Sequence, residues 1–165
     1  MKHYKLVKEE KLSGTEVSVY TIFLIDEQET VFNKFINENK NSFKSELKDI
    51  VQRIKVVGNK TGAREQFFKL KEGKPGDGVC ALYDHPGKNL RLYCIRYGKT
   101  LIIVGGGGEK ATQTLQEDSK LKEENYFLRQ VAKDIQDRMQ EGEIEFSDDY
   151  MDLMGNLEFK SEDYE

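Results

Sequence analysis

Basic side chains are concentrated in the middle of this 165-residue chain. Residues 51–110 carry 12 basic and 5 acidic side chains, a net charge of +7, although the whole chain has a net charge of −4. Lysine and arginine bind phosphate oxygens through charge-assisted hydrogen bonds, so this segment could contact a nucleic acid. The candidates for such contacts are Arg64, Lys69, Lys71, Lys74, Lys88, Arg91, Arg96, Lys99 and Lys110. The alternative is an ordinary solvated charged surface.

Tyrosines and glycines accompany these cations. Tyr83, Tyr93 and Tyr97 could stack on unpaired bases of a nucleic acid. Four consecutive glycines occupy residues 105–108. A phosphate-binding P-loop would require the pattern Gly-x-x-x-x-Gly-Lys-Ser/Thr, but alanine follows Lys110 here. We therefore expect the glycines to end a strand at a point where another part of the protein approaches the backbone closely.

The sequence offers few other reactive groups. His3 lies near the N-terminus and His85 in a predicted turn, and neither has an evident partner that would orient it as a general base. Cys80 and Cys94 lack the spacing of a zinc site, so we expect a reduced thiol pair packed in a sheet and no cofactor. An enzyme would have to work with arginine, lysine and tyrosine. Such groups suit metal-independent RNA cleavage, in which cations stabilise the charge on the phosphate.

A central β-hairpin is expected to carry several of these cations. Residues 90–96 alternate between apolar and polar types, which predicts a half-buried strand. The apolar run at residues 100–104 predicts a strand buried on both faces, with a tight turn at residues 97–99 between the two. A further strand at residues 79–84 would complete a sequential antiparallel meander. Alternate side chains of such a sheet share one face, which would bring the cations together.

Strand and helix patterns flank the meander. We expect strands over residues 4–8 and 15–25, and helices over residues 28–39, 42–57 and 119–140. Asp26 and Ser42 are the expected N-caps of the first two helices, with Glu46 near the position of a capping box. Together these elements predict an α+β fold. A helical hairpin would pack on a twisted, mainly antiparallel sheet, with an added N-terminal strand and a C-terminal helix.

The C-terminal end of the chain is acidic. Residues 140–165 carry 1 basic and 10 acidic side chains, a net charge of −9. We expect a single domain over residues 1–142 and an acidic tail over residues 143–165. The tail could be solvated, form a short strand or docking segment, or fold over the basic sheet and compete with RNA. No apolar run has the length of a membrane span and no secretion signal is evident, so a cytoplasmic location is expected.

Several short motifs follow one another between residues 62 and 110. They are Gly62-x-Arg64-Glu65, Gly76-Asp77-Gly78, Leu82-Tyr83, Arg91-Leu92-Tyr93, the apolar run at residues 100–104, and Gly107 with Lys110. In this order the motifs resemble those of the RelE/ParE toxin superfamily and, within it, the HigB-like, phage-derived branch. The likeness in the order of elements extends over residues 15–135.

This resemblance implies a small α+β fold and a specific activity. It implies the toxin of a toxin–antitoxin pair, a metal-independent endoribonuclease that cleaves mRNA on the ribosome and is blocked by a cognate antitoxin. Carried over by position, Arg64, Lys74, Arg91 and Lys110 would bind or polarise phosphate. Tyr93 would stack on a base or transfer a proton. The expected catalytic set is therefore Arg64, Arg91, Tyr93 and Lys110, and the other cations would bind nucleic acid.

Departures from the family pattern leave other functions open. Tyr83 stands where the branch usually has arginine, and Ala111 replaces a second lysine. One alternative is a non-catalytic module of the same fold that binds a protein or nucleic-acid partner, and another is an activity directed at gyrase. An enzyme requires the catalytic set to converge on one exposed face. Burial of Tyr93, or pairing of Arg91 with acidic side chains, would favour the binding module.

Overall fold

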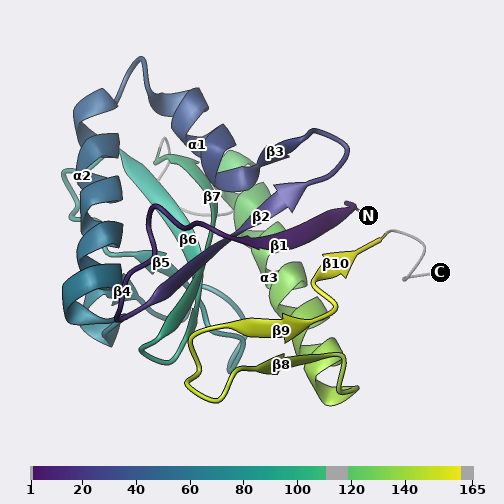
Figure 1. Cartoon of the computed structure of the whole chain (residues 1–165). Helices are drawn as coiled ribbons and strands as arrows, with labels where there is room; N and C mark the ends of the chain where they lie inside the picture. The colour runs from purple at the N-terminus through teal and green to yellow at the C-terminus, as the bar shows by residue number, and fades with distance from the viewer. Residues whose placement is uncertain (1, 111–118, 161–165) are drawn as a thin grey trace.

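An eight-stranded sheet runs through the centre of the molecule, with helices on both of its faces (Figure 1). The computed structural model describes residues 2–110 and 119–160. The strand order is β10-β1-β2-β7-β6-β5-β4, and β3 pairs separately with β2. Only β2 and β7 pair in parallel among the described strands. These features confirm the predicted mixture of helices with a mainly antiparallel sheet.

The predicted strands and helices occur in the predicted order, together with short elements that were not individually predicted. The strands of the main sheet are β1 (Tyr4–Lys8), β2 (Ser18–Leu24), β3 (Glu29–Thr30), β4 (Phe68–Lys69), β5 (Val79–Leu82), β6 (Leu90–Tyr97), β7 (Leu101–Glu109) and β10 (Glu158–Phe159). A separate hairpin contains β8 (Ile144–Phe146) and β9 (Leu153–Gly155). The helices are α1 (Val31–Asn39), α2 (Lys44–Val56) and α3 (Ser119–Gln140), with short turns of helix η1 (Val57–Thr61) and η2 (Glu65–Phe67).

The alternation of side chains along the strands builds one core layer on each face of the sheet. On strand β6, Leu92 and Cys94 pack in the layer that α1 and α2 cover. Tyr93 and Ile95 point to the other face, where they pack in the layer beneath α3. Both layers are buried, so neither face of β6 is open to solvent along its middle.

Helix α1 begins later than the sequence pattern predicts. Residues Glu29 and Thr30 pair with β2 as strand β3, and this pairing replaces the expected first turn of the helix. The N-cap is consequently Thr30 and not Asp26, and the Thr30 hydroxyl accepts a hydrogen bond of 3.0 Å from the backbone N–H of Asn33. The difference between the predicted and the observed N-cap affects only where the helix begins, because most of the apolar residues of the helix are buried as expected.

Loss of this cap should have a modest effect on stability. The substitution Thr30→Ala removes the hydroxyl acceptor, and we expect the free energy of unfolding to fall by about 1 kcal/mol. Urea denaturation followed by circular dichroism measures this change. Ser45→Ala, at an exposed position inside α2, is the matched control and should be neutral or slightly stabilising. Equal effects of the two substitutions would contradict the assignment of the cap.

The predicted capping box at the start of α2 is wrong. The helix begins after Phe43, and no side chain caps it. The carboxylate of Glu46 instead accepts hydrogen bonds from the backbone N–H groups of Asn89, at 2.8 Å, and Leu90, at 3.1 Å. These two groups lie at the start of strand β6. The Glu46 carboxylate therefore makes a long-range contact in place of the local capping box that was predicted with Ser42. The contact ties α2 to the end of the sheet that carries Arg91.

The glycine run continues a strand, which corrects the expectation that it ends one. Strand β7 extends through all four glycines to Glu109. The expected close approach is present: a Cβ atom on Gly105 would lie 3.1 Å from the Leu128 side chain of α3. A Cβ atom on Gly107 would lie 1.9 Å from the carbonyl oxygen of Arg91. The glycines therefore let α3 and strand β6 pack closely against β7.

The described part of the acidic tail packs on the rest of the fold. Strand β10 pairs with β1, and the buried ring of Phe159 stacks on Tyr4 with ring centroids 4.8 Å apart. Asp152 forms an ion pair of 3.1 Å with Lys8, and Glu143 lies 3.8 Å from Arg138. The described ion pairs of residues 143–160 do not involve a cation of the predicted nucleic-acid set. Phe146, Asp149 and Tyr150 nevertheless line a pocket together with Lys99, so this part of the tail lies beside one of those cations. The last five residues lie outside the described residues, as does the polar connection at 111–118.

None of the helices in the described part of the chain combines the length and the apolar character needed to cross a membrane.

Candidate functional site

Three of the predicted cations converge on one buried carboxylate. Asp84 is only 4% exposed. Lys110 Nζ lies 2.5 Å from its Oδ2 atom, and Arg91 NH2 lies 3.4 Å from the same oxygen. Lys69 Nζ forms an ion pair of 3.2 Å with Oδ1. We call these four residues, together with Glu72, whose carboxylate lies 3.9 Å from Arg91 NH1, the Asp84 cluster.

Neighbouring strands of the sheet position the cluster. Lys69 ends β4, Asp84 follows β5, Arg91 begins β6 and Lys110 follows β7. In an antiparallel sheet the end of one strand lies beside the start of the next, so these positions meet where the strands end on one side of the sheet. The backbone N–H of Lys110 donates to the Asn89 carbonyl at 2.7 Å, which fixes the chain where β7 ends. The site therefore depends on the order of four strands.

Electrostatic forces hold the carboxylate ionised despite its burial. Burial by itself would raise the pKa of Asp84. The hydrogen bonds from Lys110 and Lys69 and the charges of Arg91 and Lys110 outweigh this effect and hold the pKa of Asp84 below its ordinary value. Two negative charges thus face three positive ones within the cluster, which leaves a net charge of +1. The Asp84 carboxylate thus holds the three cations close together, and the cluster keeps a net positive charge.

The cations of the cluster remain accessible to an anion. The side chains of Lys69, Arg91 and Lys110 are 32%, 24% and 15% exposed. Each ammonium or guanidinium group has more donors than its contact with Asp84 uses. A phosphate oxygen at the rim could accept hydrogen bonds from these outward donors, and Asp84 would keep the three side chains in place. The arrangement is therefore chemically suited to an anion.

Two of the predicted catalytic residues lie away from the cluster. Tyr93 is 1% exposed and its ring packs in the core layer beneath α3, where a bound RNA would not reach it. Its predicted stacking or proton-transfer role does not fit this position. Arg64 is exposed, and its Nε donates to the Thr61 carbonyl at 3.1 Å. It follows Ala63, which contacts Arg96 and Lys99 at the other end of β6.

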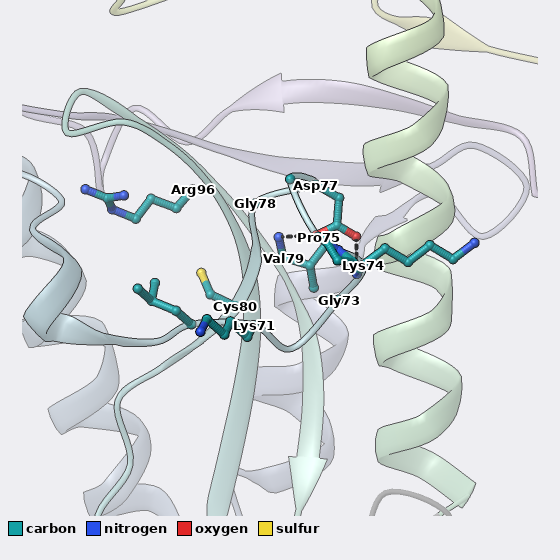
Figure 2. Close-up of a pocket in the computed structure, with 11 residues that line it drawn as sticks. Lys71, Gly73, Lys74, Pro75, Asp77, Gly78, Val79, Cys80 and Arg96 are labelled. Atoms are coloured by element: carbon teal, nitrogen blue, oxygen red, sulfur yellow. Dashed lines mark hydrogen bonds between the residues drawn. The ribbon is translucent and has the colours of Figure 1, made fainter.

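The remaining predicted nucleic-acid contacts are distributed around the 70–78 loop and two turns. This loop lines a pocket of about 530 Å³ together with Arg96 (Figure 2). Figure 2 shows Lys74 extending toward helix α3 on one side of the pocket and Arg96 extending in the opposite direction, with Lys71 beside Cys80. The Arg96 side chain donates from Nε to the Ala63 carbonyl at 2.6 Å. Lys88 and Lys99 are exposed in turns.

The cysteines and the described acidic residues offer no metal or nucleophile site. Cys80 and Cys94 face each other across β5 and β6 as buried free thiols. Burial is the main cause that raises the pKa of Cys80 to about 12, so its thiol stays protonated at neutral pH. In the described ranges, no group of three histidine, cysteine or acidic side chains could hold a metal ion.

Sequence reasoning missed the centre of the site. It selected Lys69, Arg91 and Lys110 by their charge, and the structure brings these three together. It did not select Asp84 or Glu72. The only signal for Asp84 was an acidic residue at the end of a predicted strand in a strongly basic segment.

Comparison with known proteins adds no assignment. No protein-family model, curated protein or solved structure matches the chain. The function must therefore be argued from the chemistry of the site, because a fold class alone does not determine a function.

Proposed function

We propose that this protein is a non-catalytic module that binds single-stranded RNA through the Asp84 cluster. The observation that carries the proposal is the gathering of Lys69, Arg91 and Lys110 around one buried carboxylate. Cations on an ordinary solvated surface are spread apart and turn toward water. Three that are held in a fixed arrangement with a net positive charge suit a phosphate group.

An exposed aromatic ring supports RNA as the partner over other phosphate compounds. Tyr83 directly precedes Asp84 and is 40% exposed. Lys69 Nζ lies 5.7 Å from the centroid of its ring. Proteins that bind single strands combine cations along the backbone with aromatic rings on which bases stack. A single-stranded RNA would use both features of the site.

Two features favour binding without catalysis. Arg91 and Lys110 are already engaged by Asp84, and Arg91 also lies near Glu72. Tyr93, the group expected to stack or transfer a proton, is buried. Of the predicted catalytic set, only Arg91 and Lys110 lie in the cluster, and they are held as phosphate-binding groups. These features favour the binding module.

A toxin with endoribonuclease activity is the second candidate, and two observations favour it. Arg91 and Lys110 contact the same oxygen of Asp84, so the two cations are close enough together for both to contact one phosphodiester and stabilise the charge that develops on it. His85, an exposed side chain that could transfer a proton, directly follows Asp84. The ribosome as the site of action and an antitoxin as the partner are implied by the resemblance to the RelE/ParE superfamily.

Binding of a short fluorescent single-stranded RNA, followed by anisotropy, tests the proposal. The substitution Lys69→Gln removes the most exposed cation of the cluster and leaves Arg91 and Lys110 on Asp84. We expect the dissociation constant to rise about tenfold, because one charge-assisted hydrogen bond is lost. Lys5→Gln is the matched control, since Lys5 is exposed on β1, four strands away from β5 in the sheet. Equal affinities of the two variants would contradict the proposal.

The same samples distinguish the module from the endoribonuclease. RNA is incubated with the protein in the presence of a metal chelator, with and without ribosomes, and its length is read on a denaturing gel. Intact RNA under both conditions agrees with a non-catalytic module. New fragments that disappear with Arg91→Gln but persist with Lys5→Gln would replace the module with the endoribonuclease.

A further inference from the structure

A small pocket adjoins the Asp84 cluster on the side of helix α2. Its volume is about 280 Å³, and it lies between α2 and the ends of η2 and β5. Its lining includes Val56, Gln66, Phe67, Tyr83 and His85. We infer that this pocket binds one unpaired base of the RNA strand whose phosphate lies on the Asp84 cluster. The inference rests on the proposed function and identifies which part of the RNA enters the protein.

The pocket lies next to the cluster, because residues that line it contact residues of the cluster. Tyr83 and His85 line the pocket, and Asp84 lies between them in the chain. Lys69 contacts the ring of Tyr83, and Lys110 Nζ lies 3.3 Å from the carbonyl oxygen of His85. If these two lysines bind the phosphate of a nucleotide, the base of the same nucleotide can therefore reach the pocket.

The lining suits a flat heteroaromatic ring. Val56, Phe67 and Leu82 contribute apolar surface, and Tyr83 and His85 contribute aromatic rings. The two rings are nearly perpendicular, at 78°, with centroids 5.1 Å apart. A base can thus stack on one ring and meet the edge of the other. The volume lies just below the range of about 300–1,000 Å³ that is typical of drug-sized ligands, so a single base is the better fit.

Polar groups at the pocket can recognise the edge of a base. Gln52 and Gln66 both line it, and each amide offers a donor and an acceptor. Arg53 also lines the pocket, but it bonds to the protein backbone: its NH1 group donates to the Tyr83 carbonyl at 2.6 Å. This bond fixes the backbone of Tyr83 against α2, so the aromatic wall is formed before the RNA binds. Direct contacts to base edges are what distinguish recognition of a base from binding of the backbone.

Comparison of RNA with a base-free strand tests the inference. An RNA oligomer and an abasic oligomer of the same length and charge are titrated into the full chain. We expect the wild type to bind RNA about tenfold more tightly, as stacking of one base provides. Equal affinities would overturn the inference, yet the proposed function would stand if Lys69→Gln weakened both complexes. Absence of binding to either strand would overturn both.

Two matched substitutions locate the effect. Tyr83 and Leu70 are both large exposed apolar side chains, 40% and 43% exposed, but only Tyr83 lines this pocket. Tyr83→Ala should remove most of the tenfold preference for RNA over the abasic strand. Leu70→Ala should keep the preference. Retention of the full preference by Tyr83→Ala, or its loss in Leu70→Ala, would overturn the assignment of the pocket.

Discussion

Replacing Gly107 by alanine is expected to destabilise the protein by about 3 kcal/mol, at the upper end of the usual cost of overpacking. The new Cβ atom would lie 1.9 Å from the carbonyl oxygen of Arg91 and 3.0 Å from Cα of Leu92. Both are backbone atoms of the neighbouring strand, so no side-chain rotation can relieve the clash. Strands β6 and β7 would have to separate at the irregular pairing between Leu92 and Cys94.

Urea denaturation followed by far-ultraviolet circular dichroism measures this effect, since the chain has no tryptophan. Gly87→Ala is the control, because a Cβ atom there would meet nothing within 4 Å. We expect its effect to stay within about 0.5 kcal/mol. A Gly107→Ala variant as stable as Gly87→Ala would contradict the close approach of the two strands. The same strand separation would move Arg91, so RNA binding should also weaken in Gly107→Ala.

Replacing Asp84 by asparagine is expected to lower the free energy of unfolding at pH 7 by about 2 kcal/mol. Removing one partner from a buried ion pair typically costs about 3–5 kcal/mol. The cost is smaller here because the three cations are partly exposed and can turn toward water. Asp152→Asn is a suitable control, since its carboxylate also pairs with a lysine, Lys8, but is 43% exposed. Its effect should stay below about 1 kcal/mol.

The pH dependence of this difference identifies its cause. The folded protein holds the pKa of Asp84 below its ordinary value, so ionisation of Asp84 stabilises the fold above the unfolded pKa of about 3.9. The contribution is lost as the pH falls through the lower, folded pKa. The difference in stability between wild type and Asp84→Asn should therefore be complete at pH 7 and should shrink progressively as the pH falls below about 4. A difference that persists unchanged under acid conditions would show that the ionised carboxylate is not responsible.

Local patterns were sufficient to predict most of the elements. Strand β1 and helix α3 have the predicted bounds, because the periodicity of their apolar residues is a local property of the sequence. The extension of β7 through the glycines could not be predicted from composition, since glycine disfavours strands when considered alone. It depends on α3 packing against the glycines from a distant part of the chain.

The site was predictable only in part, for two physical reasons. Tyr93 alternates with Leu92 and was therefore assigned to an open, polar face of the sheet. That face is covered by α3, a helix whose packing partner the sequence pattern does not reveal. Asp84 was missed because its burial depends on three cations that reach it from three other strands or strand ends.

The salt dependence of RNA binding tests the role of the Asp84 cluster most directly. For a single strand, the logarithm of the association constant falls with the logarithm of the salt concentration, with a slope of about −0.7 for each phosphate neutralised. We expect Lys69→Gln to reduce the steepness of this slope by about 0.7, and Lys5→Gln to leave it unchanged. Equal slopes for the wild type and both variants would show that Lys69 neutralises no phosphate and would contradict the cluster as the RNA-binding site.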